Sequence, residues 1–414
     1  MTDIQKENKS GGKVPNLRFP SFEGEWEVKK LGEIAEKIGD GLHGTPSYTD
    51  ESNYYFINGN NLINGKIEIT ENTKKIDAKT FLKNDKNLRK NTLLISINGT
   101  IGNIAKYNNE NVMLGKSVGY FNFEENSDFL YFVLQTSPVQ EHFKSELTGS
   151  TIKNLSLKTL RETNLRLPSQ DEQQKVASFL SLIDERITTQ SKILIHLKSL
   201  IESLNDSLSK QKIRINSNFE NWKKVRLGDL GYTFNGLSGK TKEDFGNGKR
   251  YIQYKQIFDS SKIAIENCGY VNVSENENQN SVKYGDIFFT ISSETPDEIG
   301  MSSVLLEDVK NVYLNSFCFG FRLNSFNEML PEFARFLFRS KVVRNEIKKL
   351  AQGSTRYNMS KTELLKLEIL LPSIKEQKEI SALLSSLDQK IQTEKSILEQ
   401  LEMQKKYLLQ QMFV

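Results

Sequence analysis

The chain of 414 residues is long enough for two or three domains with cores of their own, and its net charge of +4 permits a nucleic-acid partner without requiring one. Its 37% apolar and 26% charged residues suit a soluble protein, and no run approaches the roughly 18 apolar residues of a membrane-spanning helix. The N-terminus, MTDIQKENKSGGK, lacks the apolar stretch of a secretory signal, and two cysteines exclude a disulfide framework or a cysteine-rich metal site, so we expect a cytoplasmic protein.

Residues 21–168, after an N-terminal arm of residues 1–20, are predicted to form a first globular domain. Short β-rich runs punctuated by Asn-Gly and Gly turns predict strands at 54–58, 92–97 and 118–123. A helical stretch follows near 128–146. The mixture predicts a mixed α/β domain.

A basic run lies within this domain at residues 74–90. Its seven cations and two anions, Asp77 and Asp85, give a net charge of +5 in 17 residues. Such a run is either a solvated face or a surface for phosphate groups, and we retain its cations as candidate nucleic-acid contacts. They are Lys74, Lys75, Lys79, Lys83, Lys86, Arg89 and Lys90.

A long helix is predicted over 169–212. Pro168 ends the preceding extended segment, and Ser169 is well placed as the N-cap. Apolar residues then recur at strict 4-3 spacing with one polar break at Gln190, which is typical of a coiled-coil seam. The seam consists of Val176, Leu180, Ile183, Ile187, Leu194, Leu197, Ile201, Leu204 and Leu208.

Residues 213–372 are predicted to form a second globular domain, with strands at 286–291 and 317–323 and a helical stretch near 331–351. A looser basic cluster, diluted by Glu243 and Asp244, supplies further candidate nucleic-acid contacts: Lys240, Lys242, Lys249, Arg250 and Lys255. After Pro372 and Ser373, a second long helix is predicted over 373–414. Its seam, with polar positions at Glu394 and Lys405, is Ile380, Leu384, Leu387, Ile391, Leu398, Leu401, Leu408 and Met412.

The second half of the chain repeats the first. Residues 149–184 and 353–388 are identical at 14 of 36 aligned positions at a constant offset of 204, and the frame W-x-x-x-x-L-G occurs at 26–32 and 222–228. The sequences between these anchors diverge. A helix of some 40 residues spans roughly 60 Å and cannot leave its seam exposed, so we expect two similar globules joined by two long antiparallel coiled-coil helices with pseudo-two-fold symmetry.

The segment 211–222 also resembles 15–26, so the chain is a nearly closed ring of two repeats. Both ends should therefore lie together, near the tip of the first globule.

The chain shows no catalytic signature. The segment GLSGKT (236–241) imitates a phosphate-binding loop, but Phe234 occupies the position of its first glycine. No methyltransferase motif, dinucleotide fingerprint or nuclease carboxylate cluster occurs, and His43 is an isolated loop histidine. We therefore expect a chain without an active site or a metal site of its own.

Two dissimilar globules at a fixed separation would act as a two-site ruler, which suits DNA because its groove repeats with each helical turn. Each globule would read base edges in the major groove and place its cations on phosphates. The repeated Gly-Ser-Thr segments are either turns into the final strand of each globule or, with their neighbours, contacts to DNA. The candidates there are Ser150, Thr151, Lys153, Asn154, Ser354, Thr355, Arg356, Tyr357 and Asn358.

The pairs Glu172-Gln173 and Glu376-Gln377 are predicted to reinforce the helix starts, because an acidic residue in the first turn suits the helix dipole. Contact with a partner protein is the alternative.

The paired W-x-x-x-x-L-G frames, the GST…LP-S-x-x-E-Q junctions at 149–173 and 353–377 and the long helices together resemble the specificity (S) subunit of a type I restriction–modification system, over essentially the whole chain. The resemblance implies two target-recognition domains, each reading one half of a split, asymmetric sequence of double-stranded DNA. It implies that the helices space these domains and dock two modification (methyltransferase) subunits, which assemble with restriction subunits. It also implies no cofactor in this chain, with S-adenosylmethionine, ATP and Mg²⁺ on the partner subunits.

A different class remains open, namely a coiled-coil scaffold that joins two peptide-binding globules without nucleic acid. A scaffold needs no basic runs and would bind with little dependence on salt, whereas a DNA reader loses affinity steeply as salt rises. A DNA enzyme fused to its own reader is opposed by the missing motifs.

Overall fold

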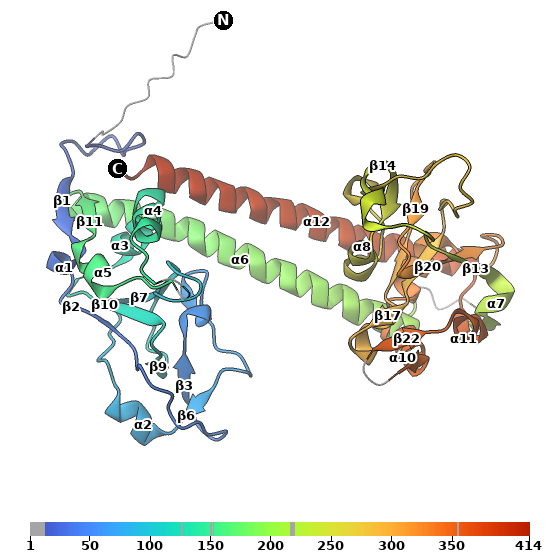
Figure 1. The fold of residues 1–414 in the computed structure, drawn as a ribbon, viewed down its shortest axis with the longest axis horizontal. Helices are drawn as coiled ribbons and strands as arrows, with labels where there is room; N and C mark the ends of the chain where they lie inside the picture. Colours follow the sequence, from blue (N-terminus) through green and yellow to red (C-terminus); the bar gives the residue numbers. More distant parts are fainter. Residues whose placement is uncertain (1–12, 126, 150, 152, 216–219, 354–355) are drawn as a thin grey trace, which may run out of the picture. The chain divides into compact units, whose positions relative to one another are not determined.

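The computed structural model describes residues 13–125, 127–149, 151, 153–215, 220–353 and 356–414, which form two compact units. Unit 1 contains the residues up to Ser191 together with Ile397–Val414, and unit 2 contains Lys192–Ser396. Helix α6 (Gln170–Ser209) therefore begins in unit 1 and ends in unit 2, whereas α12 (Ile374–Gln411) begins in unit 2 and ends in unit 1 (Figure 1). Both units mix helices with sheets, which confirms the predicted fold class.

Unit 1 contains a four-stranded antiparallel sheet in the order β2-β10-β7-β8. Its strands are β2 (Lys37–Asp40), β10 (Val118–Asn122), β7 (Thr92–Ser96) and β8 (Ile104–Lys106). A second sheet, in the order β6-β3-β9, contains one parallel pair, β3 with β9. Its strands are β6 (Lys75–Ile76), β3 (Tyr54–Ile57) and β9 (Val112–Leu114), and β4 (Leu62–Ile63) pairs with β5 (Lys66–Ile67) nearby in the chain. The predicted strands match β3, β7 and β10 to within one residue, because aromatic and β-branched residues gather there.

Unit 2 repeats this topology with other residues. Its four-stranded sheet has the order β13-β20-β16-β18, with strands β13 (Gly231–Asn235), β20 (Cys318–Leu323), β16 (Ile287–Thr290) and β18 (Ser302–Val304). A second sheet contains β15 (Gly269–Val271), β14 (Phe245–Ile252) and β19 (Tyr313–Leu314), and β14 is again parallel to β19. A third contains β17 (Ser292–Ser293), β22 (Tyr357–Met359) and β21 (Ala351–Gln352). The two units are thus built on one plan.

Each predicted helical stretch before a junction is two helices rather than one. In unit 1 these are α3 (Asp128–Val133) and α4 (Ser137–Ser145), and in unit 2 they are α9 (Pro331–Leu337) and α10 (Lys341–Lys349). Pro138 lies in the first turn of α4, where a backbone N–H is not needed for a helical hydrogen bond. In the interior of one continuous helix the same proline would break it. In unit 2 the Ser340 hydroxyl accepts from Val343 N and caps a new helix instead.

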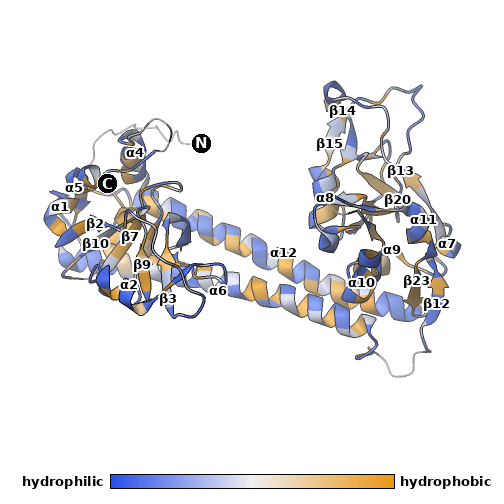
Figure 2. Cartoon of the chain, turned by 60° about the horizontal axis from the view of Figure 1, so that its bottom comes forward, coloured by the Kyte–Doolittle hydropathy of each residue, from blue (hydrophilic) through white to orange (hydrophobic). Residues whose placement is uncertain are grey.

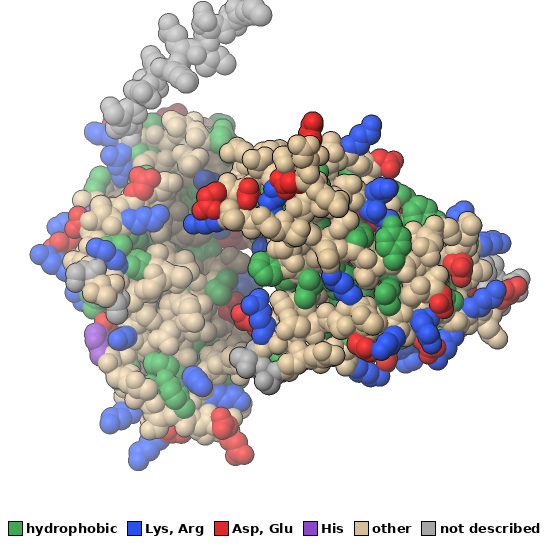
Figure 3. All heavy atoms as spheres, turned by 45° about the vertical axis from the view of Figure 1, so that its right-hand side comes forward, with side chains coloured by type: hydrophobic (Ala, Val, Ile, Leu, Met, Phe, Trp, Pro, Cys, Tyr) green, Lys and Arg blue, Asp and Glu red, His purple; other side chains and the backbone are tan. Residues whose placement is uncertain are grey.

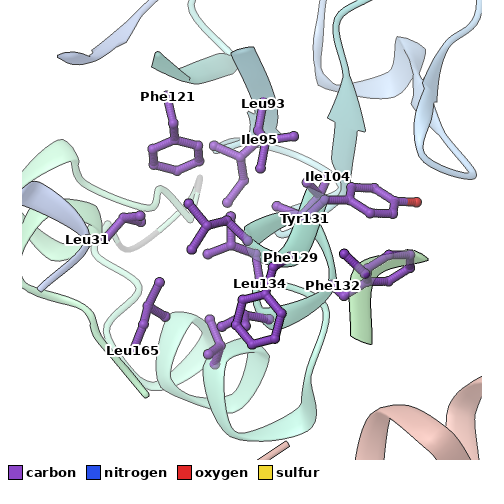
Figure 4. Close-up of a cluster of buried hydrophobic side chains, with 14 of the residues drawn as sticks. Leu31, Leu93, Ile95, Ile104, Phe121, Phe129, Tyr131, Phe132, Leu134 and Leu165 are labelled. Atoms are coloured by element: carbon purple, nitrogen blue, oxygen red, sulfur yellow. The ribbon is translucent and has the colours of Figure 1, made fainter. Parts of the chain in front are cut away.

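The core of unit 1 lies between the four-stranded sheet and these helices. Leu93, Ile95 and Phe121 point from the sheet toward Phe129 and Leu134 of the α3 region (Figure 4). All five side chains are buried, and aromatic rings supply much of the apolar area that stabilises the unit. The equivalent core of unit 2 contains Ile287, Phe289, Phe321, Phe333 and Phe338.

Each W-x-x-x-x-L-G frame packs against the junction of its own unit. Strand β1 (Glu27–Lys30) pairs with β11 (Asn164–Leu167), and β12 (Lys223–Arg226) pairs with β23 (Glu368–Leu371). The short helices that follow, α1 (Leu31–Ile34) and α7 (Leu227–Leu230), pack on α5 (Leu157–Glu162) and α11 (Lys361–Lys366).

Glycine at the second position of the Leu-Gly pair allows a close approach to the helix beside it. A Cβ on Gly32 would lie 3.0 Å from the Arg161 carbonyl oxygen, and one on Gly228 would lie 3.0 Å from the Leu365 carbonyl oxygen. The frame and the junction of each unit are therefore one packed structure, although they lie far apart in sequence.

The described N-terminal residues lie beside the C-terminus in unit 1, as the ring of repeats predicted. Leu17 N donates to the Gln411 carbonyl oxygen at 2.8 Å, and the Trp26 ring lies 6.1 Å from that of Phe413. Figure 1 shows the C-terminus beside β1 and β11. The described N-terminal residues and the C-terminal helix thus belong to one unit.

The heptad seam is covered along both helices, and none of its predicted members is exposed. Figure 2 shows hydrophobic and hydrophilic patches alternating along α6 and α12. The two ends of the seam are not confined to a helix pair, because Val176, Leu180 and Ile183 join the core of unit 1 and Ile380 and Leu384 join that of unit 2.

Within each unit the two helix segments run antiparallel. Leu408 and Met412 meet the N-terminal half of α6 in unit 1, and Leu208 meets the N-terminal half of α12 in unit 2.

Candidate nucleic-acid interface

The Glu of each LP-S-x-x-E-Q junction holds an arginine from the segment before the Trp frame. Arg18 binds Glu172 through Nε and Nη2 at 2.8 and 2.7 Å, and Arg214 binds Glu376 through Nε and Nη2 at 3.2 and 2.7 Å. Both carboxylates are at most 2% exposed, and Glu172 raises the pKa of Arg18 by accepting its hydrogen bonds. The same arginines bind carbonyl oxygens in the loops that precede each Trp, which fixes those loops to the helix starts.

The Gln of each junction also binds backbone. Gln173 donates to the Pro168 carbonyl oxygen, while Gln377 donates to those of Pro372 and Glu328 and accepts from Leu330 N. Ser169 and Ser373 accept from the backbone N–H three residues on, as the predicted N-caps should. The Glu-Gln pairs therefore stabilise the helix starts, as predicted, and also bind residues from other parts of the unit. Because Glu172 and Glu376 are at most 2% exposed, their carboxylates offer no surface to a partner protein.

An aspartate about two turns after the first seam residue of each helix forms an ion pair, with a partner from a different element in each unit. In unit 1, Asp184 pairs with Lys405 of α12 at 2.7 Å, which explains the polar residue in that seam. In unit 2 the equivalent Asp388 pairs with Arg335 of α9, whose Nε also donates to Ser261. An ion pair to a half-buried aspartate thus occurs at the same repeat position in both units.

The basic run 74–90 forms β6, helix α2 (Ala78–Lys83) and the loop that follows. Its two anions are occupied locally, because Asp77 caps α2 by accepting from Thr80 N at 2.8 Å and Asp85 accepts from Asn87 N at 2.9 Å. These hydrogen bonds from Thr80 lower the pKa of Asp77, so it stays ionised without neutralising the lysines by an ion pair.

Most cations of the run project into solvent. Lys74, Lys79, Lys83, Arg89 and Lys90 are exposed, and Lys75 and Lys86 are half-buried. Arg89 pairs with Glu36 at 2.9 Å and Lys75 donates to the Asp50 carbonyl oxygen, whereas the described residues supply no carboxylate partner to Lys79, Lys83, Lys86 or Lys90. The structure therefore gathers these cations on one exposed segment.

The second basic cluster is less uniform than its sequence predicted. Lys240 is bound to Glu277 at 2.6 Å with its side chain only 8% exposed, and this pairing lowers the pKa of Glu277 to about 2. Lys255 of α8 (Tyr254–Asp259) pairs with Asp259 at 2.6 Å. Lys240 is thus unavailable to a phosphate in this conformation, and the remaining candidates are Lys242 in the turn before β14 and Lys249 and Arg250 within β14.

Each Gly-Ser-Thr segment lies at a hairpin, but this hairpin does not lead directly into the final strand. In unit 1, Thr148 and Asn154 exchange two backbone hydrogen bonds, and in unit 2, β21 pairs with β22 around the segment. A short helix, α5 or α11, then separates each turn from the last strand. Thr151, Lys153, Arg356 and Asn358 are exposed, Asn154 and Tyr357 are half-buried, and Ser150, Ser354 and Thr355 lie outside the described residues.

A second loop lies beside each hairpin and is hydrogen-bonded to the chain that follows it. In unit 1 it follows Ile97, whose carbonyl oxygen accepts from Leu155 N at 2.9 Å, and in unit 2 it follows Ile291, whose carbonyl oxygen accepts from Met359 N at 2.9 Å. On the face of unit 2 that comes forward in Figure 3, hydrophobic side chains lie exposed among those of Lys and Arg. The candidate interface therefore comprises one exposed basic segment and a pair of loops in each unit.

Two residues that sequence reasoning missed hold these loops. Gln140 of α4 donates to the Gly102 carbonyl oxygen at 3.0 Å, and Arg344 of α10 donates to the Gly300 and Ile299 carbonyl oxygens at 2.7 and 2.6 Å. Burial lowers the pKa of Arg344 to about 10, so the guanidinium still donates as a cation at neutral pH. Gln140 and Arg344 occupy equivalent positions of the two repeats, at the offset of 204, and this equivalence could have identified them from the sequence.

Other features met in the sequence carry no chemistry of their own. Segment 236–241 follows β13 and includes the bound Lys240, so it forms no phosphate cradle. His43 is exposed beside Asp40, and both cysteines are buried, which raises the pKa of each thiol. Within the described ranges no group of three His, Cys, Asp or Glu could hold a metal ion. None of the helices described is long and apolar enough to cross a membrane.

Both halves of the chain match one family model. Residues 23–199 and 219–403 each correspond to the type I restriction modification DNA specificity domain. Among curated proteins of Methanocaldococcus jannaschii, the MjaVIII specificity subunit is 22% identical over 95% of this chain and 92% of its own. The MjaIX specificity subunit is 26% identical over 63% of this chain, and the match spans 62% of the length of that relative.

Solved structures share the fold. The S subunit of a type I restriction–modification system from M. genitalium superposes with a TM-score of 0.57 at 18% identity, covering 97% of this chain and 99% of that one. A chain of a type I system solved to describe complex assembly and conformational transition superposes with a TM-score of 0.55 at 15% identity, covering 93% and 96%.

Proposed function

The chain belongs to the type I restriction modification DNA specificity family, and from this premise we propose that each of its two domains reads one half of a bipartite, asymmetric DNA target. At the level the family fixes, it is the specificity subunit of a type I restriction–modification system and acts in DNA target recognition. The observation that carries the finer proposal is a repeated frame around changed loops. Identical ion pairs and packed glycines hold both domains, whereas the segments presented beyond this frame differ in residues and length.

We assign phosphate contacts to the exposed cations of 74–90 and to Lys242, Lys249 and Arg250 in and before β14. Phosphate contacts position a protein on the duplex, and base contacts specify the sequence. Lys79 and Lys83 support this assignment, since they are exposed one turn apart on α2 and no described carboxylate neutralises them. The loop pairs beside the Gly-Ser-Thr hairpins are assigned to base contacts, because the loop that precedes each hairpin differs in residues and length between the repeats.

The long helices are assigned two roles, spacing of the two domains and docking of two modification subunits. Besides the buried seam, they carry apolar side chains that remain exposed within each unit: Leu182, Ile397, Met403 and Tyr407 in unit 1, and Ile193, Ile195, Leu200 and Leu383 in unit 2. Clusters of exposed large apolar residues mark protein interfaces. We therefore place the modification subunits on the exposed sides of the two helices.

The chain is proposed to be non-catalytic. Methyl transfer and cleavage are assigned to the modification and restriction subunits of the complex, together with S-adenosylmethionine, ATP and Mg²⁺. The ion pair between Lys240 and Glu277 supports this assignment, because Lys240 is the lysine of the segment that imitates a phosphate-binding loop and the pair keeps it from a phosphate.

Mapping of methylated sites in cells that carry this chain and its modification subunit tests the proposal. The expected result is one motif of two short specified parts separated by a constant unspecified gap, with unrelated sequences in the two parts. A contiguous motif, or methylation that does not change when the chain is replaced by another specificity subunit, would contradict it. A peptide-binding scaffold predicts that the purified chain shows no salt-dependent affinity for duplex DNA.

A further inference from the structure

The loop before each Gly-Ser-Thr hairpin has the same two ends in both units. It begins after Ile97 or Ile291, which bind the chain beyond the hairpin, and it ends at Gly102 or Gly300, which Gln140 or Arg344 holds. The hydroxyls of Ser96 and Thr290 also occupy equivalent places, accepting from Asn103 N at 2.9 Å and Met301 N at 3.0 Å. The loops are therefore two versions of one element with fixed ends.

Between these ends the loops differ in length. Four residues (98–101) separate them in unit 1 and eight residues (292–299) in unit 2. In unit 1 the short loop bridges directly to the hairpin through Asn98 and Asn154. In unit 2 the longer loop forms β17, pairs with β22 and turns outward through the residues Glu294–Glu298.

The extra residues form one wall of a pocket of about 380 Å³ within unit 2. Tyr254 and Phe258 of α8 form another wall, with their rings stacked at 6.2 Å and an interplanar angle of 16°. Tyr254 Oη donates to the Ser292 carbonyl oxygen at 2.8 Å, so helix and loop hold each other. Phe317, 59% exposed, and the exposed Arg356 of the Gly-Ser-Thr hairpin complete the lining.

The pocket's chemistry favours a planar, amino-bearing group over a phosphate. Three aromatic rings and a guanidinium offer flat stacking surfaces, and base–aromatic stacking tolerates any base. Glu294 and Glu298 repel phosphate, and a carboxylate accepts from the exocyclic amino group of cytosine or adenine. Ser293 Oγ donates to Glu298 Oε2 at 3.1 Å, which orients that acceptor.

Resting on the proposed function, we propose that this pocket binds one cytosine or adenine of the half-site read by unit 2, turned out of the base stack. Unstacking costs a few kcal/mol in duplex DNA, and stacking on an aromatic pocket offsets it. The four-residue loop of unit 1 lacks the residues that form this wall in unit 2, so the two half-sites would be read by different means.

Fluorescent bases in the mapped target test the pocket. The full chain, in complex with its modification subunits, is titrated onto duplexes in which 2-aminopurine replaces each adenine, or pyrrolocytosine each cytosine, of the second half-site. Besides the base that the modification subunits methylate, one further position is expected to brighten several-fold on binding, because unstacking relieves quenching. Phe317→Ala is expected to abolish that signal and weaken target binding by about 5- to 150-fold, the range for loss of one stacked base.

Phe326→Ala is the matched control, since Phe326 is also an exposed phenylalanine of unit 2 but packs on Tyr284 outside the pocket. It should behave as the parent chain. The pocket assignment is overturned if no position other than the methylated base brightens on a duplex that the parent chain distinguishes from scrambled DNA, or if Phe317→Ala retains the signal at that further position. Failure of the parent chain to distinguish the mapped target at all would instead overturn the proposed function.

Discussion

At the scale of single residues, the two units place different polar pairs at equivalent positions of their four-stranded sheets. In unit 2, Asp286 binds Arg322 through two hydrogen bonds of 2.7 and 2.6 Å, and in unit 1, Thr92 donates to Asn122 Oδ1 at 2.8 Å. Each first residue also accepts from the backbone N–H three positions earlier, at Lys283 or Arg89. The geometry is shared, but one pair is ionic and the other neutral.

Substitution by Ala should therefore cost more in unit 2. Asp286→Ala leaves Arg322 without its partner and is expected to destabilise unit 2 by about 3 kcal/mol, the lower end for breaking a buried ion pair. Thr92→Ala, the matched change, should cost unit 1 about 1 to 2 kcal/mol. Hydrogen exchange of the β16 and β7 amides reports each sheet separately. Equal losses of protection in the two sheets would contradict this account.

At the scale of elements, the recurring motifs form the frame and the divergent segments form the candidate interface. The Trp frame, the short helix with its glycine and the junction carboxylate all face one another inside each unit. By contrast, the basic helix α2 of unit 1 has no repeated counterpart in sequence. The cations of α2 are exposed and belong to the part of the chain that changes.

Lysines on α2 should contribute to DNA affinity through counterion release. Replacing Lys79 and Lys83 by Gln is expected to weaken binding to all duplexes alike and to reduce the slope of log K against log salt by about 1.8, or about 0.9 for each lost phosphate contact. Lys349→Gln is the control, because Lys349 is exposed on α10 and already pairs with Glu346. A salt slope unchanged by the double variant would remove α2 from the interface.

At the scale of the whole molecule, two helices belong to both units. Each leaves one repeat and ends in the other, and the described chain ends are bonded together in unit 1. The polar positions Gln190 and Glu394 interrupt each seam at equivalent places and are buried. The proposed spacing role therefore rests on the length of the helices between the two junctions.

Lengthening both helices should lengthen the gap between the two half-sites. One heptad inserted after Gln190 and another after Glu394 keep each seam in phase and add about 10 Å. At 3.4 Å per base pair, the unspecified gap in the methylated motif is expected to grow by about 3 base pairs with the specified parts unchanged. A heptad inserted into α6 alone should instead lower stability, because the paired seams then differ in length. An unchanged gap in the double insertion would exclude the helices as the spacer.

Local and periodic signals were sufficient for much of this protein. Strands rich in aromatic and β-branched residues, the capped starts of the long helices at Ser169 and Ser373, the heptad seam and the repeat itself were all readable from the chain. The repeat also predicted that both described ends belong to one unit. These features depend on side chains a few residues apart, or on comparison of the chain with itself.

Contacts between distant residues were decided by the tertiary structure alone. Nothing local indicates that Glu172 receives Arg18, that Lys240 is neutralised by Glu277, or that Arg344 fixes a loop that walls a pocket. Each depends on which side chains the folded sheets bring within hydrogen-bond distance, and exposure follows from the same packing. A run of charges is therefore visible in sequence, whereas the availability of each charge is a property of the fold.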